Sequence, residues 1–182
     1  MEEDNLRSQI ESEAVEAFVD ASERFCTLIE ERNVISRVSF IEKAHETLSL
    51  LYYRSLLLPN IEPPDEFFEE SISQDIWAEL FRSLQDLLVD WEYYWDVFNP
   101  NDPQDEDPIC SNLADDLADI YRDIKTGLLL WERDSLEAKQ KAIWQWRFSF
   151  WAHTGQHING ALRAIYWRLY DFIDNDLDEL DE

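Results

Sequence analysis

Apolar residues recur at steps of three and four positions along most of the chain, the spacing of one face of an α-helix. The clearest case is the stretch from Ser111 to Trp131, which combines this period with several aspartates. Its apolar stripe consists of Leu113, Leu117, Ile120, Ile124, Leu128 and Trp131. At about 100° per residue, Asp116 and Asp123 lie about 80° to one side of the stripe and Asp119 a little further round. This stretch is predicted to be a core helix with an acidic edge, from which Asp115 faces away into solvent.

The same period predicts further helices over residues 11–32, 36–58, 71–98 and 134–174. The last of these segments forms one helix or two, depending on whether Gly155 interrupts it. Pro59 ends the second helix, and no alternation of apolar and polar residues is long enough for a sheet. The prediction is an all-α, single-domain bundle of five or six helices spanning residues 11–174. A frayed polar segment is expected at residues 1–10 and a disordered acidic tail at residues 175–182.

Composition and charge narrow the possible partners. The 182 residues are 45% hydrophobic and 14% aromatic, enough for a sizeable core, which excludes a disordered chain. The net charge of −26 opposes direct binding to nucleic acid or to an anionic membrane. No apolar run approaches the roughly 20 residues of a membrane span. A protein partner with a basic surface is predicted, while solubility, salt adaptation and imitation of nucleic acid remain alternative reasons for the acidity.

The start of the chain and its cysteines favour a cytoplasmic location. The first residues, MEEDNLRSQIESE, are acidic and lack the apolar region of a secretory signal. Cys26 and Cys110 are the two cysteines, and a chain without a signal keeps them reduced. Cys110 adjoins a predicted helix start, where a thiolate is favoured, so it is the thiol to test for reactivity.

Aromatic residues are unusually dense in two places. The segment DWEYYWDVF, at residues 90–98, is aromatic almost all round a helix and needs a cover from the chain or from a partner. The segment from Trp144 to Trp151 is apolar on two sides, as expected for a central helix or an oligomer contact. Trp91, Trp95 and Trp146 are therefore predicted to form an interaction surface, and a homo-oligomer is possible. Four tryptophans on two adjacent helices, with Arg147 and Arg163 nearby, also suggest an aromatic ligand pocket: Trp144, Trp146, Trp151 and Trp167. Core or interface anchors are the more common role of such residues.

The sharpest candidate for chemistry is the pair His153 and His157. The two residues are four apart, so a continuous helix would place both imidazoles on one face, as in a two-histidine metal half-site. If the acidic edge packs against that face, a polar seam forms from Asp116, Asp119, Asp123, His153, His157 and Arg163. The predicted metal ligands are His153, His157 and Asp116, a set suited to zinc, iron or manganese. The alternative is a purely structural clasp of hydrogen bonds, and no cofactor is then expected.

Two other acidic patterns carry less information. Asp116 with Asp119, and Glu42 with Glu46, have the spacing of carboxylate pairs that hold magnesium and pyrophosphate. Chance pairs are expected among 41 acidic residues, and no cluster of lysine or arginine accompanies these. The acidic loop at residues 99–108 offers oxygen ligands for calcium, but it lacks the glycine of such loops and contains three prolines, so a solvated linker is predicted.

Four segments, LYYRSLLLP, VFNP, DDLADIYRDIK and FSFWAHTGQHINGALRAIY, resemble the uncharacterised bacterial family called domain of unknown function 5063. The family pattern has an aromatic residue, commonly tryptophan, where this chain has Thr154. The resemblance implies a compact helical bacterial protein and no particular activity. The sequence thus predicts a non-enzymatic protein that binds other proteins, and the alternative is a metal-binding protein or metal-dependent hydrolase.

Overall fold

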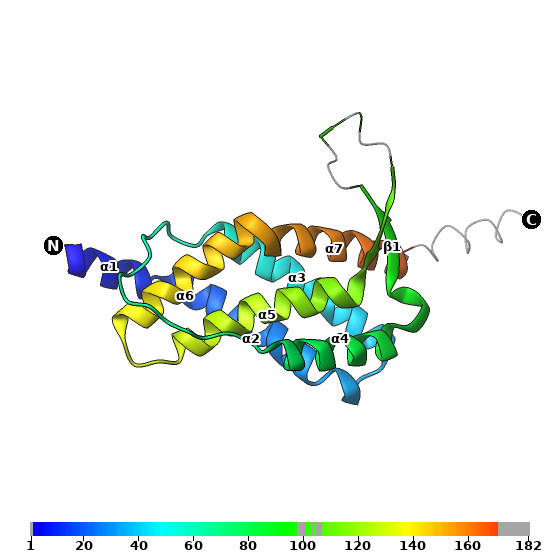
Figure 1. Ribbon diagram of the computed structural model, residues 1–182, viewed down its shortest axis with the longest axis horizontal. Helices are drawn as coiled ribbons and strands as arrows, with labels where there is room; N and C mark the ends of the chain where they lie inside the picture. Colours follow the sequence, from blue (N-terminus) through cyan, green and yellow to red (C-terminus); the bar gives the residue numbers. More distant parts are fainter. Residues whose placement is uncertain (1, 98–100, 103, 105–106, 171–182) are drawn as a thin grey trace, which may run out of the picture.

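The predicted core helix forms α5 (Leu113–Trp131), which lies in the middle of the helical bundle in the computed structural model (Figure 1). The structure describes residues 2–97, 101–102, 104 and 107–170. Four helices pack against α5: α2 (Glu13–Glu30), α4 (Gln74–Leu88), α6 (Leu136–Ser149) and α7 (Gly155–Tyr170). Because these neighbours cover α5 on several sides, the predicted stripe is at most 4% exposed from Leu113 to Leu128.

The remaining elements complete one bundle with a small appendage. They are α1 (Glu2–Ile10), α3 (Arg37–Leu56), the 3-10 turns η1 (Arg32–Val34) and η2 (Val89–Trp91), the π-helical turn η3 (Phe150–Thr154) and the strands β1 (Tyr93–Asp96) and β2 (Ile109–Asn112). The α3 helix packs between α2 and α7, while α6, η3 and α7 follow one another along one edge of the bundle (Figure 1). The all-α, single-domain prediction is confirmed. No helix within the described ranges has both the length and the apolar content to cross a membrane.

Polar caps decide where several helices begin. The side chains of Ser36, Ser73 and Ser135 each accept the backbone N–H three residues further on, at the starts of α3, α4 and α6. Asn112 accepts two backbone N–H groups, at 2.8 and 3.2 Å, and so starts α5. Since these bonds satisfy donors that have no partner inside the helix, they hold the first turn of α5, which carries the acidic edge.

Two boundary predictions are wrong. The segment expected to be frayed forms α1, because its Ile10 is only 3% exposed and joins the core. The helix expected to run to residue 98 ends at Leu88. Val89 follows it with a φ of 53°, a left-handed conformation that interrupts the α-helical hydrogen bonds. The predicted ends at residues 98 and 174, the acidic tail and much of the 99–108 loop lie outside the described residues.

The aromatic segment after α4 forms a β-hairpin that the sequence analysis did not predict. β1 pairs antiparallel with β2, from Tyr93 opposite Asn112 to Asp96 opposite Ile109. Two strands of four residues are too short for a clear alternating pattern. The hairpin stands out from the end of the bundle where α7 and α4 also end (Figure 1). The strand β1 therefore brings its aromatic side chains against α7.

Trp146 is not part of any interaction surface, which corrects the sequence prediction. Its side chain is 2% exposed and packs against Phe18 and Trp131. A Cβ at Gly127 would overlap the indole of Trp146, so the missing side chain makes room for the ring. The indole N–H donates to the carbonyl of Ile124 at 3.1 Å, which satisfies its polar group inside the core.

Candidate metal centre

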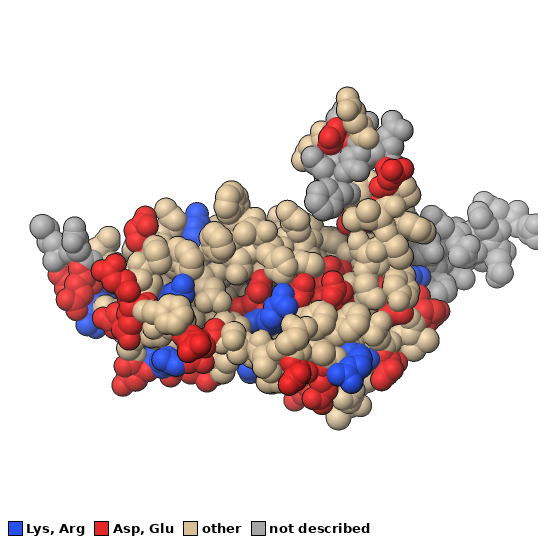
Figure 2. Space-filling view, in the orientation of Figure 1, with Lys and Arg blue, Asp and Glu red and all other residues tan. Residues whose placement is uncertain are grey.

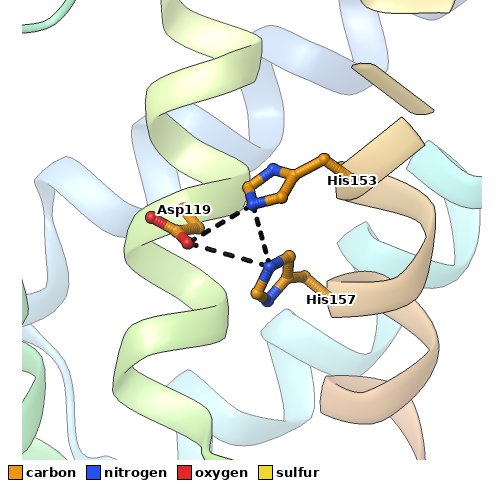
Figure 3. A group of neighbouring side chains, drawn as sticks. All are labelled: Asp119, His153 and His157. Atoms are coloured by element: carbon orange, nitrogen blue, oxygen red, sulfur yellow. Dashed lines mark hydrogen bonds and ion pairs between the residues drawn. The ribbon is translucent and has the colours of Figure 1, made fainter. Parts of the chain in front are cut away.

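His153 and His157 lie opposite α5, where the π-helical turn η3 meets α7 (Figure 3). Their Nε2 atoms are 3.1 Å apart and their ring centroids 4.4 Å apart. The chain departs from α-helical geometry in η3, which contains His153 and ends just before Gly155, the residue at which the sequence left open one helix or two. The two rings still meet on the side that faces α5, and π-helical turns of this kind occur often at functional sites.

Each histidine binds a different aspartate through its other ring nitrogen. Nδ1 of His153 lies 2.9 Å from Oδ2 of Asp123, and Nδ1 of His157 lies 2.7 Å from Oδ1 of Asp116. A carboxylate only accepts hydrogen bonds, so each Nδ1 carries a proton. A neutral imidazole protonated at Nδ1 has a lone pair on Nε2. Two such lone pairs at 3.1 Å repel one another unless a cation, either one proton or a metal ion, lies between them.

Asp119 presents one oxygen to the same point (Figure 3). Its Oδ2 lies 3.6 Å from Nε2 of His153 and 3.7 Å from Nε2 of His157. Its Oδ1 accepts the indole N–H of Trp77 at 2.8 Å and pairs with Arg122 at 2.9 Å. A point equidistant from the three facing atoms is about 2.0 Å from each, the usual length of a zinc bond to nitrogen or carboxylate oxygen.

The outer aspartates are held by further hydrogen bonds. Asp123 also accepts the hydroxyl of Thr154 at 2.7 Å. Asp116 also accepts the hydroxyl of Tyr94, from β1, at 2.7 Å. Second partners of this kind keep a carboxylate pointed at its histidine, as in metal sites where a carboxylate orients each imidazole. The hairpin and η3 thus both contribute to the arrangement.

The three facing groups are partly accessible from solvent. The side chain of His153 is 40% exposed, that of His157 23% and that of Asp119 13%. Figure 2 shows acidic side chains over α5 in the middle of one face, with basic side chains among them. Because the three facing groups keep this exposure, an ion can reach them without passing through the core.

The surrounding carboxylates favour a cation. Burial lowers the pKa of His157, but the hydrogen bond and charge of Asp116, followed by the charges of Asp119 and Asp115, outweigh it and raise the pKa above its ordinary value. Burial, then the charges of Asp119 and Asp116, raises the pKa of Asp115. Asp115 is thus half-buried beside this group of charges, and the prediction that it faces away into solvent is wrong.

The structure divides the predicted seam into three groups. His153, His157 and Asp119 face one another. Each offers one ligand atom, these atoms all lie within 4.8 Å of one another, and such a set can hold a metal ion. Asp116 and Asp123 lie behind the histidines, so Asp119 takes the third position predicted for Asp116.

Arg163 is not a member of the seam. It donates to the carbonyl of Trp95 at 2.8 Å and pairs with Asp96 at 2.7 Å, which ties α7 to the hairpin. Sequence reasoning also missed Trp77 and Tyr94 as contributors to the site. They come from α4 and β1, and a local period carries no signal for such distant contacts. The one sequence hint is Gly160, where a Cβ would overlap the Tyr94 hydroxyl.

Comparison with known proteins identifies the fold without an activity. The family model described as Domain of unknown function (DUF5063) matches residues 9–171. The crystal structure of protein BF1032 from Bacteroides fragilis is similar, with a TM-score of 0.77 and 26% sequence identity, and the match covers 87% of this chain and 94% of that one. No curated protein matches the chain. Neither similarity assigns an activity to this chain.

Proposed function

Since the chain belongs to the family described as Domain of unknown function (DUF5063), which names no activity, we propose a function from its site alone. The protein binds one divalent transition metal ion, zinc by preference, through Nε2 of His153, Nε2 of His157 and Oδ2 of Asp119. The outer aspartates, Asp116 and Asp123, orient the two imidazoles. This was the alternative function in the sequence analysis, with Asp119 now in the place of Asp116.

One observation carries the proposal: two Nε2 atoms 3.1 Å apart, while both Nδ1 atoms are bound to carboxylates. The outer bonds select the tautomer that leaves Nε2 free to bind a metal. A purely structural set of hydrogen bonds does not require the two Nε2 atoms to meet, because each histidine would be stabilised as well by a bond to a separate partner. Here both free nitrogens and a third carboxylate oxygen meet at one point.

The separations of the three atoms favour zinc over larger or octahedral ions. Ligands of a tetrahedral ion with bonds near 2.0 Å are about 3.3 Å apart. Adjacent ligands of an octahedral ion at the same bond length are closer, at about 2.8 Å. The observed 3.1, 3.6 and 3.7 Å have a mean nearer the tetrahedral value. Two nitrogens and one carboxylate oxygen are also donors that zinc accepts readily, whereas magnesium and calcium take oxygens.

Three protein ligands leave one position of a tetrahedral ion for water. A water bound to zinc ionises near neutral pH and becomes a nucleophile, which is the chemistry of zinc hydrolases. Hydrolysis is therefore the enzymatic activity that follows most directly from this site. The binding of a basic protein partner, which the sequence analysis ranked first, stays a prediction, supported by the net charge of −26.

The test is metal analysis of protein purified without a histidine tag, stripped with a chelator and titrated with zinc. We expect about one equivalent of zinc to bind, and His157→Ala and Asp119→Ala to reduce affinity by at least 100-fold. His45→Ala is the matched control, because His45 lies on α3 beside Tyr170 and outside the site. Less than a tenth of an equivalent bound, or equal affinity in His157→Ala and His45→Ala, would overturn the proposal.

A further inference from the structure

Besides the candidate metal centre, the structure has a pocket of about 580 Å³ between the hairpin and α7. Aromatic and cationic side chains line it, chiefly Trp91, Tyr93, Trp95, Trp167, Arg163 and Arg168. The volume falls within the range of small-molecule sites, roughly 300 to 1,000 Å³. Tyr94 links this pocket to the metal centre, since it is one of the lining residues and its hydroxyl donates to Asp116.

The aromatic walls remain in contact with solvent. Trp95 is 69% exposed, Trp167 59% and Tyr93 52%. Three large rings at the edge of one pocket leave much apolar surface in water, which a bound ring would cover. The rings belong to residues of a paired strand and of α7, so the backbone that carries them is held in place before any ligand arrives. A flat aromatic group is the shape that such walls accept.

The two arginines are anchored by main-chain carbonyls. Nη2 of Arg163 donates to the carbonyl of Trp95, and Nη2 of Arg168 donates to the carbonyl of Tyr93 at 3.1 Å. Asp96 offsets the charge of Arg163, whereas Arg168 has no carboxylate partner among the described residues. The pocket lining therefore has a local excess of positive charge in a chain whose net charge is −26.

We propose that this pocket binds a small molecule that joins a planar aromatic ring to one anionic group, a carboxylate or a phosphate. The ring stacks against Trp95 and Trp167, and the anion accepts hydrogen bonds from the free N–H groups of Arg168. A planar guanidinium that is anchored by a hydrogen bond to a main-chain carbonyl points its remaining N–H donors in a fixed direction. A carboxylate and a phosphate can both accept hydrogen bonds from donors arranged in this way. The overall negative charge repels anions elsewhere on the protein, so selectivity for an anion must come from this pocket.

Three probes with one ring system test the inference by calorimetric titration at 0.15 M salt: 2-naphthoate, 2-naphthyl phosphate and the neutral 2-naphthalenemethanol. We expect at least one of the anions to bind at least tenfold more tightly than the alcohol. The stronger of the two identifies the preferred anion. Arg168→Gln should reduce that preference to less than threefold, while Arg24→Gln, which removes an exposed arginine of α2 that pairs with Asp20, should leave it unchanged.

A second variant covers the event that Arg168→Gln loosens the hairpin. Trp95→Ala removes a side chain that is 69% exposed, so the fold should survive, and all three probes should bind at least fivefold more weakly. The proposal is overturned if the alcohol binds as tightly as both anions. It is also overturned if Trp95→Ala binds each probe as the parent protein does.

Discussion

Replacing Asp116 with asparagine tests whether a residue behind the metal position controls its affinity. Asp116 is 6% exposed, and its two oxygens accept the Nδ1–H of His157 and the hydroxyl of Tyr94, both at 2.7 Å. Asparagine has the same shape but only one acceptor oxygen, and its amide group donates. Asp116→Asn therefore leaves one of these donors facing an N–H group, or forces His157 into the tautomer whose Nε2 carries a proton and cannot bind metal.

The expected loss is 10- to 100-fold in zinc affinity, the usual effect of removing such an outer carboxylate, which is about 1.4 to 2.7 kcal/mol. A competition titration against a coloured chelator measures it. Asp115→Asn is the matched control, because it removes one nearby negative charge without removing a partner of either histidine; its effect should stay within about threefold. Equal affinity in Asp116→Asn and Asp115→Asn would refute the reasoning, since charge alone would then explain the loss.

Four further outcomes follow from single positions. Gly127→Ala should lower the free energy of unfolding by about 1 to 3 kcal/mol in a urea titration, because its methyl group overlaps a buried indole. Val89→Gly should raise the unfolding free energy by about 1 kcal/mol in the same assay, since glycine adopts the φ of 53° without strain. In the native protein a thiol reagent at pH 8 should modify exposed Cys110 and spare Cys26, because burial raises the pKa of Cys26 to about 12; both should react in denaturant. Because the pKa of His157 is higher in the folded protein, its protonation stabilises the metal-free fold fully at pH values below the ordinary pKa of about 6.5. This stabilisation should be lost as the pH rises through the pKa of the folded state. His157→Gln should therefore flatten this part of the pH profile of thermal unfolding.

Several parts of the fold could be predicted because they depend on neighbours along the chain. Leu117 and Ile124 are spaced so that any α-helix places them on the same side, and both are at most 3% exposed. Proline and capping residues also act only on residues close to them in the chain, as Ser36 does when its side chain caps the start of α3. Where the local signal was ambiguous the prediction failed. The aromatic segment near Trp95 suits a strand as well as a helix, and the conformation of Val89 decides between them.

The sequence alone determined that His153 and His157 are four residues apart and that the core helix has an acidic edge. Whether the two rings share a face, and whether that edge packs against them, depended on the backbone near Gly155 and on the tertiary structure. The sequence also did not determine which aspartate meets the free nitrogens. Asp116 and Asp119 differ by less than one helical turn, about 4.5 Å along the axis, and the period of the stripe is the same for either choice. Only the packing of η3 and α7 against α5 sets the axial offset that brings Oδ2 of Asp119 to nearly equal distances from the two Nε2 atoms and places Asp116 behind His157. Trp77, which holds Asp119 from a position 42 residues away, depends in the same way on how the helices pack, because no local pattern records the relative position of two helices.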